Sequence, residues 1–323
     1  MAEASWLLEA NGLKKYFPIT KGIFSRPAGY VKAVDGVSFR IRPGETLGLV
    51  GESGCGKSTT GRMVLHLIRP TEGTVLYKGQ DLGQMGAQQM REIRKRMQMI
   101  FQDPFSSLNP RMTVTEIIGE PLAIHRLSSG REKKERIAEL LELVGLSKRD
   151  MGKYPHQFSG GQRQRIGIAR ALATNPELVV CDEAVSALDV SVQAQVLNLL
   201  KELQERLHLS YLFISHDLNV VKYISDRICV MYLGEIVEEA DSEALFGKPL
   251  HPYTQALFSA VPNPDPIARK ERILLKGEAP SAADLPSGCK FHPRCPKAME
   301  RCKTEAPALR EVASGHQVAC HLY

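Results

Sequence analysis

The sequence lacks any apolar run of about 18 residues, the length that a helix needs to cross the hydrocarbon core of a bilayer. The first ten residues, MAEASWLLEA, also lack the basic start and apolar stretch of a cleavable signal peptide. These two absences predict a cytosolic chain that is not exported. Any role at a membrane is therefore expected to come through a partner protein.

A strong excess of one charge is also missing. The formal net charge is +6, from 42 lysines and arginines against 36 acidic residues, and the charges are spread along the chain. This mild balance does not require nucleic acid as a partner, because an anionic ligand or a membrane surface would explain it equally well. At 323 residues the chain has room for a large core and about two domains.

Four of the seven cysteines stand near the end of the sequence. Disulfide bonds are not expected in a reducing cytosol. Proline content rises in the same region, because ten of the 19 prolines lie between Pro249 and Pro307. We place a domain boundary near Asp241.

The run GESGCGKST at residues 51–59 fits the phosphate-loop pattern G-x-x-x-x-G-K-[ST]. It lies between a predicted buried strand, residues 45–50, and a predicted helix, residues 62–68. Glycines let backbone N–H groups turn inward toward a β-phosphate, and a helix N-terminus adds positive potential. We expect Lys57 to reach the β- and γ-phosphates and Ser58 to ligate Mg²⁺. The other loop residues expected at the nucleotide are Gly51, Ser53, Gly54, Cys55, Gly56 and Thr59.

A second motif, ELVVCDE at residues 177–183, is an apolar strand that ends in two acids. It matches the second phosphate-site strand of P-loop proteins. Asp182 is expected to hold Mg²⁺, and Glu183 to orient and polarise the water that attacks the γ-phosphate. His216 follows another strand-like run, residues 211–214, and is expected to contact the γ-phosphate from the strand end.

The run FSGGQRQR at residues 158–165 precedes an amphipathic helix. Ser159, Gly160 and Gly161 would expose backbone N–H groups at the helix start and so form a second anion site. A chain with one phosphate loop and a second anion site requires an explanation. We interpret the second site as meeting the nucleotide of another subunit, packed head to tail, with ATP between the two chains.

The order of these motifs resembles that of the ATP-binding subunits of ABC transporters. The resemblance rests on the phosphate loop, Gln102 in IFQDP, the signature FSGGQ, the acidic strand, SALD at residues 186–189 and His216. It implies that Gln102 senses Mg²⁺ and the γ-phosphate and links to the transmembrane partner. It also implies that Gln162 belongs to the signature and that Asp189 lies in the loop crossing the dimer interface.

By the same resemblance Tyr16, in LKKYF, would stack on adenine, with Tyr30 as a competitor and a structural role for Tyr16 as the alternative. Phe158 stands where leucine is commoner in the family, and Ala184 where proline is commoner. Neither departure changes a group that meets phosphate, so we expect a site competent for hydrolysis. The implied Mg²⁺ ligands are Ser58, Gln102 and Asp182.

The resemblance implies an α/β fold of the P-loop NTPase class. This is an ABC cassette with a RecA-like α/β core, an antiparallel β subdomain and a helical subdomain, followed by a Pro- and Cys-rich C-terminal extension. We assign residues 1–240 to the nucleotide-binding domain, with a helical insert at about 104–170, and residues 241–323 to the extension. By resemblance, residues 103–118 would help to form the groove for a cytoplasmic helix of the membrane subunit; the alternative is a plain connecting loop.

Local patterns add detail to this architecture. Turn signals at residues 42–44 and 72–73 separate β-rich runs. Residues 131–146 predict a helix whose charged positions form a solvated face. Its apolar face is formed by Ile137, Leu140, Leu141 and Val144.

The extension resembles the C-terminal region of the oligopeptide, dipeptide and nickel importer ATPases, and the chain is especially similar to the dipeptide branch. Its cysteines have the spacing C-x5-C-x6-C-x17-C, in a Pro-rich segment with little apolar content of its own, and would let a metal staple order it. Four thiolates suit zinc or an iron–sulfur cluster, and the lack of C-x2-C pairs argues against the common zinc folds. The resemblance favours a structural [4Fe–4S] cluster, while zinc and unligated thiols stay open. The cysteines are Cys289, Cys295, Cys302 and Cys320, with His292 and His316 as substitute ligands.

Taken together, the resemblance implies an ATPase that powers an importer of dipeptides or oligopeptides. ATP would close a dimer of cassettes, and hydrolysis would reopen it. The expected partners are a paralogous cassette or a second copy, two transmembrane permease subunits and an extracytoplasmic peptide-binding protein, with no nucleic acid. The chain would lie peripherally on the cytoplasmic face of the inner membrane. The alternatives are an importer ATPase for nickel or another solute, a soluble ABC ATPase acting on ribosomes or DNA, and a regulatory iron–sulfur sensor.

Overall fold

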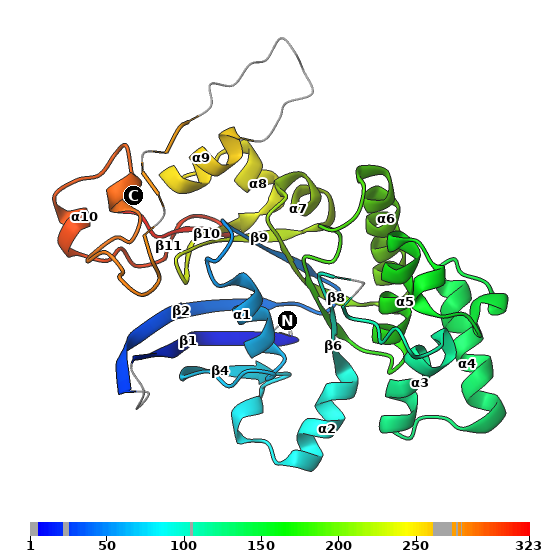
Figure 1. Ribbon diagram of the computed structural model, residues 1–323. Coiled ribbons are helices and arrows are strands. Elements are labelled where there is room, and N and C mark those ends of the chain that lie inside the picture. Colours follow the sequence, from blue (N-terminus) through cyan, green and yellow to red (C-terminus); the bar gives the residue numbers. More distant parts are fainter. Residues whose placement is uncertain (1–5, 22–25, 104–105, 261–272, 276, 279) are drawn as a thin grey trace, which may run out of the picture. The chain divides into compact units, whose positions relative to one another are not determined.

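The computed structural model describes residues 6–21, 26–103, 106–260, 273–275, 277–278 and 280–323 (Figure 1). The chain divides into two compact units. The first comprises residues 1–41, 46–83 and 215–323, and the second comprises residues 42–45 and 84–214. Residues 104 and 105 of the expected groove segment, and residues 261–272 of the extension, lie outside the described residues.

An antiparallel sheet in the first unit has the strand order β2-β1-β4-β5. The turn predicted at residues 72–73 is wrong, because β4 already begins at Glu72 and the turn lies at residues 78–79. Gly73 is needed for close strand approach instead: a Cβ there would lie 2.4 Å from the Gly12 carbonyl oxygen. The strands are β1 (Leu8–Lys21), β2 (Arg26–Ile41), β4 (Glu72–Tyr77) and β5 (Gln80–Asp81).

A second set of strands in the first unit runs in the order β11-β12-β10-β9-β3. All five residues of β3 are buried, which confirms the predicted strand. β3 and β9 are parallel, whereas the other neighbours are antiparallel. The strands are β3 (Thr46–Val50), β9 (Arg227–Tyr232), β10 (Glu235–Asp241), β11 (Arg310–Ala313) and β12 (His316–Val318).

The helices of the first unit are short. The helix after the phosphate loop ends at Val64 rather than at residue 68, and His66 adopts a left-handed φ of +52° just beyond it. The described helices of this unit are α1 (Lys57–Val64), α7 (Leu218–Ile224), α8 (Ser242–Gly247), α9 (Pro252–Ser259) and α10 (Arg301–Thr304).

The extension shares its packing with strands of the cassette. β12 pairs with β10, and Val318 of β12 packs with Leu250 and Cys320 in a small buried cluster. The carboxylate of Glu238 on β10 is fully buried and accepts a hydrogen bond from the Leu250 N–H at 2.7 Å. We expected a metal to order the extension, but these contacts with β10 also hold it in place.

The second unit contains three parallel strands in the order β8-β7-β6, with helices that follow or precede them in the chain (Figure 1). Every residue of β7 and β8 is buried, as the apolar runs predicted. The strands are β6 (Met97–Ile100), β7 (Leu178–Asp182) and β8 (Ser210–Ser215).

The helices of the second unit carry the expected apolar faces. In α4 the four apolar positions predicted to share one face are all buried, up to the C-cap residue Val144. Among the described residues, the structure has no helix that combines the length and apolar character of a membrane span. The helices are α2 (Ala87–Arg96), α3 (Val114–Ile124), α4 (Gly130–Leu143), α5 (Gly160–Leu172) and α6 (Val190–Leu207).

Candidate functional site

The phosphate loop connects β3 to α1 and is held by close backbone packing. A Cβ on Gly56, whose φ is +106°, would lie 2.1 Å from the Ala33 carbonyl oxygen. A Cβ on Gly51 would lie 2.1 Å from the Met231 carbonyl oxygen. These contacts leave no room for a side chain, so the two glycines of the motif are required by the surrounding strands as well as by a phosphate.

Lys57 folds back into the loop. Lys57 is only 4% exposed, and its Nζ donates to the carbonyl oxygens of Gly51 and Glu52 at 2.8 and 2.9 Å. The adjacent Cys55 is buried, and burial raises the pKa of its thiol although the Lys57 charge opposes this. An ammonium group that is already desolvated inside a ring of backbone groups is a strong anion ligand.

The remaining loop residues differ in accessibility. Ser53 and Gly54 at the tip are exposed, whereas Ser58 and Thr59 at the start of α1 are half-buried. The loop is fixed on its other side by Gly234, whose N–H donates to the Cys55 carbonyl oxygen at 2.9 Å. The loop thus joins an exposed tip and a buried lysine at a helix start.

Tyr16 lies on β1 and is half-buried, whereas the competing Tyr30 on β2 is 55% exposed. The Tyr16 hydroxyl donates to Asp35 Oδ1 at 2.5 Å. Burial, together with this carboxylate, raises the pKa of Tyr16 above its ordinary value. The Lys32 ammonium stands 5.4 Å from the centre of the Tyr16 ring. The adenine-stacking role of Tyr16 stays a prediction.

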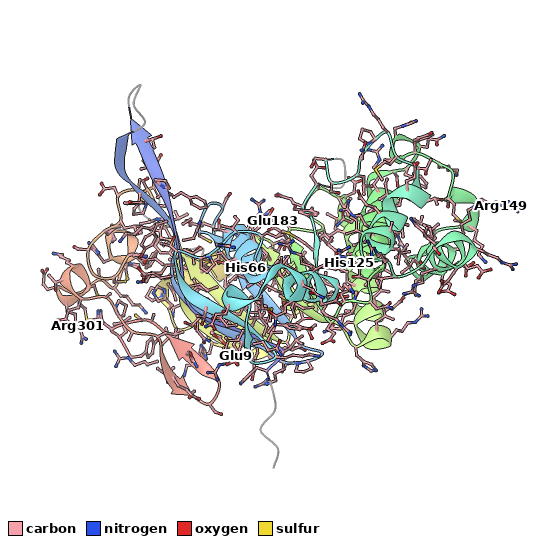
Figure 2. All side chains as sticks on the ribbon, turned by 90° about the horizontal axis from the view of Figure 1, so that it is seen from below. Glu9, His66, His125, Arg149, Glu183 and Arg301 are labelled. Carbon is pink, nitrogen blue, oxygen red and sulfur yellow. The ribbon has the colours of Figure 1, made fainter. Side chains whose placement is uncertain are left out.

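The acidic end of β7 brings two predicted residues together. Glu183, labelled in Figure 2, follows the buried Asp182, and its carboxylate Oε2 accepts a hydrogen bond from Gln102 Nε2 at 2.7 Å. Gln102 is exposed and stands two residues after β6. Glu183 has a left-handed φ of +49°, and its N–H donates to the Ile214 carbonyl oxygen of β8 at 2.9 Å. A non-glycine residue in this region stores backbone strain.

The signature run forms the start of α5. Ser159 is the N-cap, and its Oγ accepts the Gln162 N–H at 3.3 Å while Gln162 Oε1 accepts the Ser159 N–H at 3.0 Å. Both side chains are exposed, and Gly161 is buried against Val192 of α6. Asp189 is exposed at the N-cap of α6. The sequence placed a helix start here, as the structure shows, and the anion-binding role of its N–H groups stays a prediction.

The predicted nucleotide residues are divided between the two units. Tyr16, the phosphate loop and His216, which is exposed directly after β8, belong to the first unit. Gln102, Asp182, Glu183, the signature and Asp189 belong to the second. Their roles as one site are taken up below as a proposal.

Three of the four cysteines of the extension, Cys289, Cys295 and Cys320, have thiol pKa values that burial raises. Burial, with a smaller contribution from the thiols of Cys302, Cys295 and Cys320, raises the pKa of Cys289 to about 11. Across the part of the chain that the structure describes, however, no three or more Cys, His, Asp or Glu side chains are grouped closely enough to hold a metal ion. The donor set suits a soft metal, but the side chains as they stand do not form its ligand cage.

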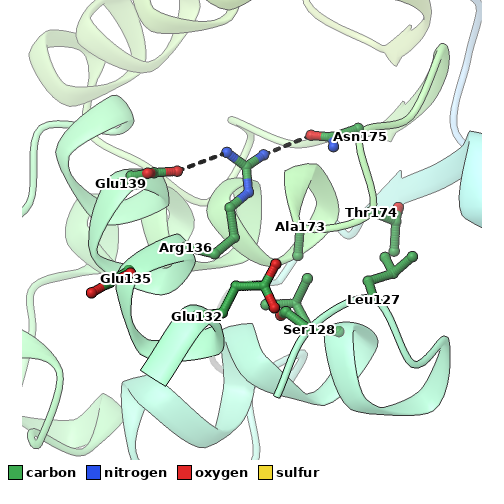
Figure 3. A pocket seen from close by; sticks show the side chains of 10 residues that line it. Leu127, Ser128, Glu132, Glu135, Arg136, Glu139, Ala173, Thr174 and Asn175 are labelled. Carbon is green, nitrogen blue, oxygen red and sulfur yellow. Dashed lines mark hydrogen bonds and ion pairs between the residues drawn. The ribbon is translucent and has the colours of Figure 1, made fainter. Parts of the chain in front are cut away.

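A hollow of about 380 Å³ in the second unit contains none of the predicted site residues (Figure 3). Arg136 stands at its edge and bonds to Glu139 Oε2 at 3.1 Å and Asn175 Oδ1 at 2.6 Å. Glu132 and Glu135 also line it. Three carboxylates against one guanidinium disfavour a phosphate ligand there.

Two family comparisons agree with this geometry. Residues 34–186 match the family described as ABC transporter, and residues 237–302 match the family described as the C-terminal region of oligopeptide/dipeptide transporters. The first match spans the phosphate loop, the signature and the acidic strand. The second begins within β10 and ends at Cys302.

Whole-length relatives and solved structures extend the likeness. The chain is 57% identical to the oligopeptide transport ATP-binding protein AppF of Bacillus subtilis (strain 168), covering 100% of this chain and 99% of that protein. It is 52% identical to the probable peptide ABC transporter ATP-binding protein y4tS of Sinorhizobium fredii, over 98% of this chain and 90% of that one. A solved ATP-binding cassette, dimeric and bound to ADP and Pi, has a TM-score of 0.64 and 30% identity, covering 73% of this chain and 98% of its own.

Proposed function

This chain belongs to the ABC transporter family, among the ATP-binding subunits of oligopeptide and dipeptide transporters, and we propose that it hydrolyses ATP to power a peptide importer. The observation that carries the proposal is the phosphate loop, in which Lys57 is buried among backbone carbonyl groups and two glycines have no room for a Cβ. An ATP triphosphate would replace these carbonyl groups as the partner of the ammonium.

We assign the nucleotide contacts as follows. The N–H groups of residues 51–59 surround the β-phosphate, and Lys57 spans the β- and γ-phosphates. Mg²⁺, when bound, supplies positive charge between the phosphates, and Ser58, Gln102 and Asp182 would hold it. The oxygen-rich donor set suits this hard cation. Tyr16 stacks on adenine while its hydroxyl remains on Asp35.

Hydrolysis is assigned to Glu183. Its carboxylate orients the attacking water and accepts the developing proton, while His216 contacts the γ-phosphate. The bond from Gln102 to Glu183 gives Gln102 a further task. The Gln102 amide donates to Glu183 Oε2, so it must share or release this oxygen when the attacking water binds to Glu183. Gln102 would thereby link the Mg²⁺ site to the catalytic carboxylate.

The signature is assigned to a partner cassette's nucleotide. The signature residues Ser159, Gly160, Gly161 and Gln162, of which Ser159 and Gln162 are exposed, would receive the γ-phosphate bound by the other subunit, with Asp189 crossing between the two. The dimeric state of the solved cassette supports a dimer of this kind. We propose a paralogous chain or a second copy as the mate.

The transport partners follow from the peptide-importer relatives. We propose two membrane permease subunits, docked in part on residues 103–118, and an extracytoplasmic peptide-binding protein, with this chain on the cytoplasmic face of the inner membrane. Dipeptides or oligopeptides are the proposed cargo. A nickel or other solute importer is the alternative within the same family.

For the four cysteines we retain the [4Fe–4S] cluster as a proposal. Its support is the backbone contact between two of the cysteines, since the Cys289 N–H donates to the Cys302 carbonyl oxygen at 2.8 Å. Burial raises the pKa values of Cys289, Cys295 and Cys320, and these values would fall when a metal binds, because ligation requires thiolates. Iron and sulfide analysis of protein purified without oxygen tests this. Absence of both, with zinc present instead, would replace the cluster by a zinc site.

The function is tested by reconstituting the full complex in vesicles and measuring uptake of labelled dipeptides. The Lys57→Ala variant should bind ATP at least tenfold more weakly and transport none, because the loop loses its buried cation. Uptake by Lys57→Ala at the unmodified rate would overturn the proposal. Uptake of nickel but of no peptide would select the alternative cargo.

A further inference from the structure

Glu52, next to Gly51 in the phosphate loop, is bound by two residues of the C-terminal extension. Its N–H donates to the Tyr253 hydroxyl at 2.9 Å, and its carbonyl oxygen accepts Lys57 Nζ at 2.9 Å. Its carboxylate receives Arg294 Nη1, at 3.0 Å from Oε2 and 3.2 Å from Oε1. Tyr253 and Arg294 both follow residue 241, so the extension supplies two of these three contacts to one residue of the loop.

Arg294 is held firmly in place. It ends a short 3₁₀ helix, His292–Arg294, and its side chain is 10% exposed against 33% for Glu52. The neighbouring Phe291 is 1% exposed and packs edge-on against Tyr232 and Tyr253, with ring centres 5.3 and 5.5 Å away. The aromatic cluster thus anchors the backbone that carries Arg294.

The same segment makes a second contact with the nucleotide side of the cassette. The buried Lys290 Nζ lies 2.9 Å from Asp35 Oδ2 and 3.1 Å from the Leu233 carbonyl oxygen. Asp35 in turn accepts the Tyr16 hydroxyl. Lys290 Nζ also lies 2.9 Å from Glu235 Oε1. Two cations four residues apart thus reach three acids, of which Glu52 lies in the phosphate loop and Asp35 beside the proposed adenine contact.

The charge of Glu52 explains why such a contact matters for a triphosphate ligand. An unpaired carboxylate within the loop would repel the phosphates, and the repulsion is strong where water is partly excluded. A guanidinium that pairs with both carboxylate oxygens offsets that repulsion. The pair borders a hollow of about 270 Å³, so dissolved salt still reaches it.

We propose that Arg294 is a positioning residue of the nucleotide site: it neutralises Glu52 and, together with Tyr253, holds the loop tip, so that the extension sets the affinity for ATP. This inference rests on the proposed ATP-binding function. It gives the C-terminal extension a role at the ATP site through Arg294 and Tyr253, two residues that lie outside the ATP-binding motifs.

The test is a charge-removal cycle in the full-length protein, with binding of a fluorescent ATP analogue measured at two salt concentrations. Arg294→Gln should weaken binding about tenfold, the fold-change of one charge-assisted hydrogen bond. Adding Glu52→Gln to that variant should restore affinity to within about threefold, because no carboxylate is left to repel phosphate. The loss in Arg294→Gln should also shrink as salt is raised.

Arg301→Gln is the matched control, because Arg301 is an exposed arginine of the same extension (labelled in Figure 2). It should bind like the unmodified chain. Thermal melting without nucleotide establishes that each variant is folded. If Arg294→Gln does not fold, Arg294→Lys replaces it and should bind within about threefold of the unmodified protein, since the charge is kept.

Two results would overturn the inference: a folded Arg294→Gln with unchanged affinity, or a double variant as weak as Arg294→Gln alone. An Arg294→Lys variant that loses affinity tenfold while folded would count against the neutralising role as well. Lys57→Ala distinguishes failure of the proposed ATP-binding function from failure of the role given to Arg294. If the unmodified chain and Lys57→Ala bind the analogue equally poorly, the ATP-binding function itself fails, and this inference falls with it.

Discussion

The phosphate loop and the acidic end of β7 serve the same proposed chemistry but are built differently. The loop is fixed by backbone packing, since Gly56 has no room for a Cβ and Lys57 is 4% exposed. The acidic end depends on a contact between side chains, because the exposed Gln102 donates a hydrogen bond to Glu183. Glu183 itself follows β7 and has a strained, left-handed backbone. Changes in the loop should therefore disturb folding and binding together, whereas changes at the acidic end should alter only the reaction.

The largest effect is expected from Glu183→Gln at the acidic end. The amide cannot accept the proton of the attacking water, so ATP turnover should fall about 10²- to 10³-fold. ATP binding and melting temperature should stay unchanged, because the carboxylate lies outside the loop. Phosphate release by the purified complex measures this.

Glu205→Gln is the control for that change, because Glu205 is an exposed acid on α6. It should leave turnover unaltered. If Glu183→Gln hydrolyses ATP at the unmodified rate, Glu183 loses the role assigned to it. A large fall in melting temperature would instead show that the acidic end is as structural as the loop.

The loop side is probed by comparing Gly56→Ala with Gly54→Ala. Both positions have positive φ, +106° and +79°, so alanine is strained by roughly 1 kcal/mol at each. Only at Gly56 does the Cβ meet a backbone atom, the Ala33 carbonyl oxygen at 2.1 Å, which adds about 1–3 kcal/mol of overpacking. Gly56→Ala should therefore melt several degrees lower than Gly54→Ala in the absence of nucleotide. Equal melting temperatures would mean that the strands around the loop yield easily.

The free energy of unfolding should fall at low pH because of His251. This N-cap of α9 is buried, its Nδ1 accepts the Tyr253 N–H at 3.0 Å, and burial lowers its pKa to about 3. Below about pH 6.5 the unfolded chain binds a proton that the folded imidazole refuses. The free energy of unfolding should therefore fall by about 1.4 kcal/mol per pH unit between pH 6.5 and 3, and this contribution is constant above that range.

Urea unfolding at pH 7, 6 and 5 checks the effect of His251. His251→Asn keeps an N-cap acceptor and has no titrating ring, so its stability should depend less steeply on pH. Parallel slopes for the two proteins would exclude His251 as the source.

The smallest effect on stability is expected from Ser159→Ala. Loss of the 3.3 Å cap bond to the Gln162 N–H should lower the free energy of unfolding by about 0.5–1 kcal/mol. Thr113→Ala is a matched control, because Thr113 caps α3 with a bond of the same 3.3 Å to the Glu116 N–H. Both should lose similar stability, but only Ser159→Ala should impair ATP-driven dimer formation, measured by light scattering. Equal dimer formation by the two variants would contradict the partner-site role.

Local patterns predicted the buried strands β3, β7 and β8 and the apolar face of α4 correctly, because residues close in sequence determine periodicity. The same reading was wrong where a distant strand mattered. Gly73 looked like a turn glycine, whereas the approach of β1 requires it inside β4. The helix after the loop was also predicted too long, since its end lies at Val64.

The sequence by itself determined the chemistry of this protein, because the loop lysine, the two acids and the signature serine are specified by residue type and spacing. Only the tertiary structure decided which of these groups are paired. Gln102 reaches Glu183 across 81 positions, and Arg294 reaches Glu52 across 242. Contacts at such separations depend on how strands and loops pack in three dimensions, and no local pattern of side chains encodes them.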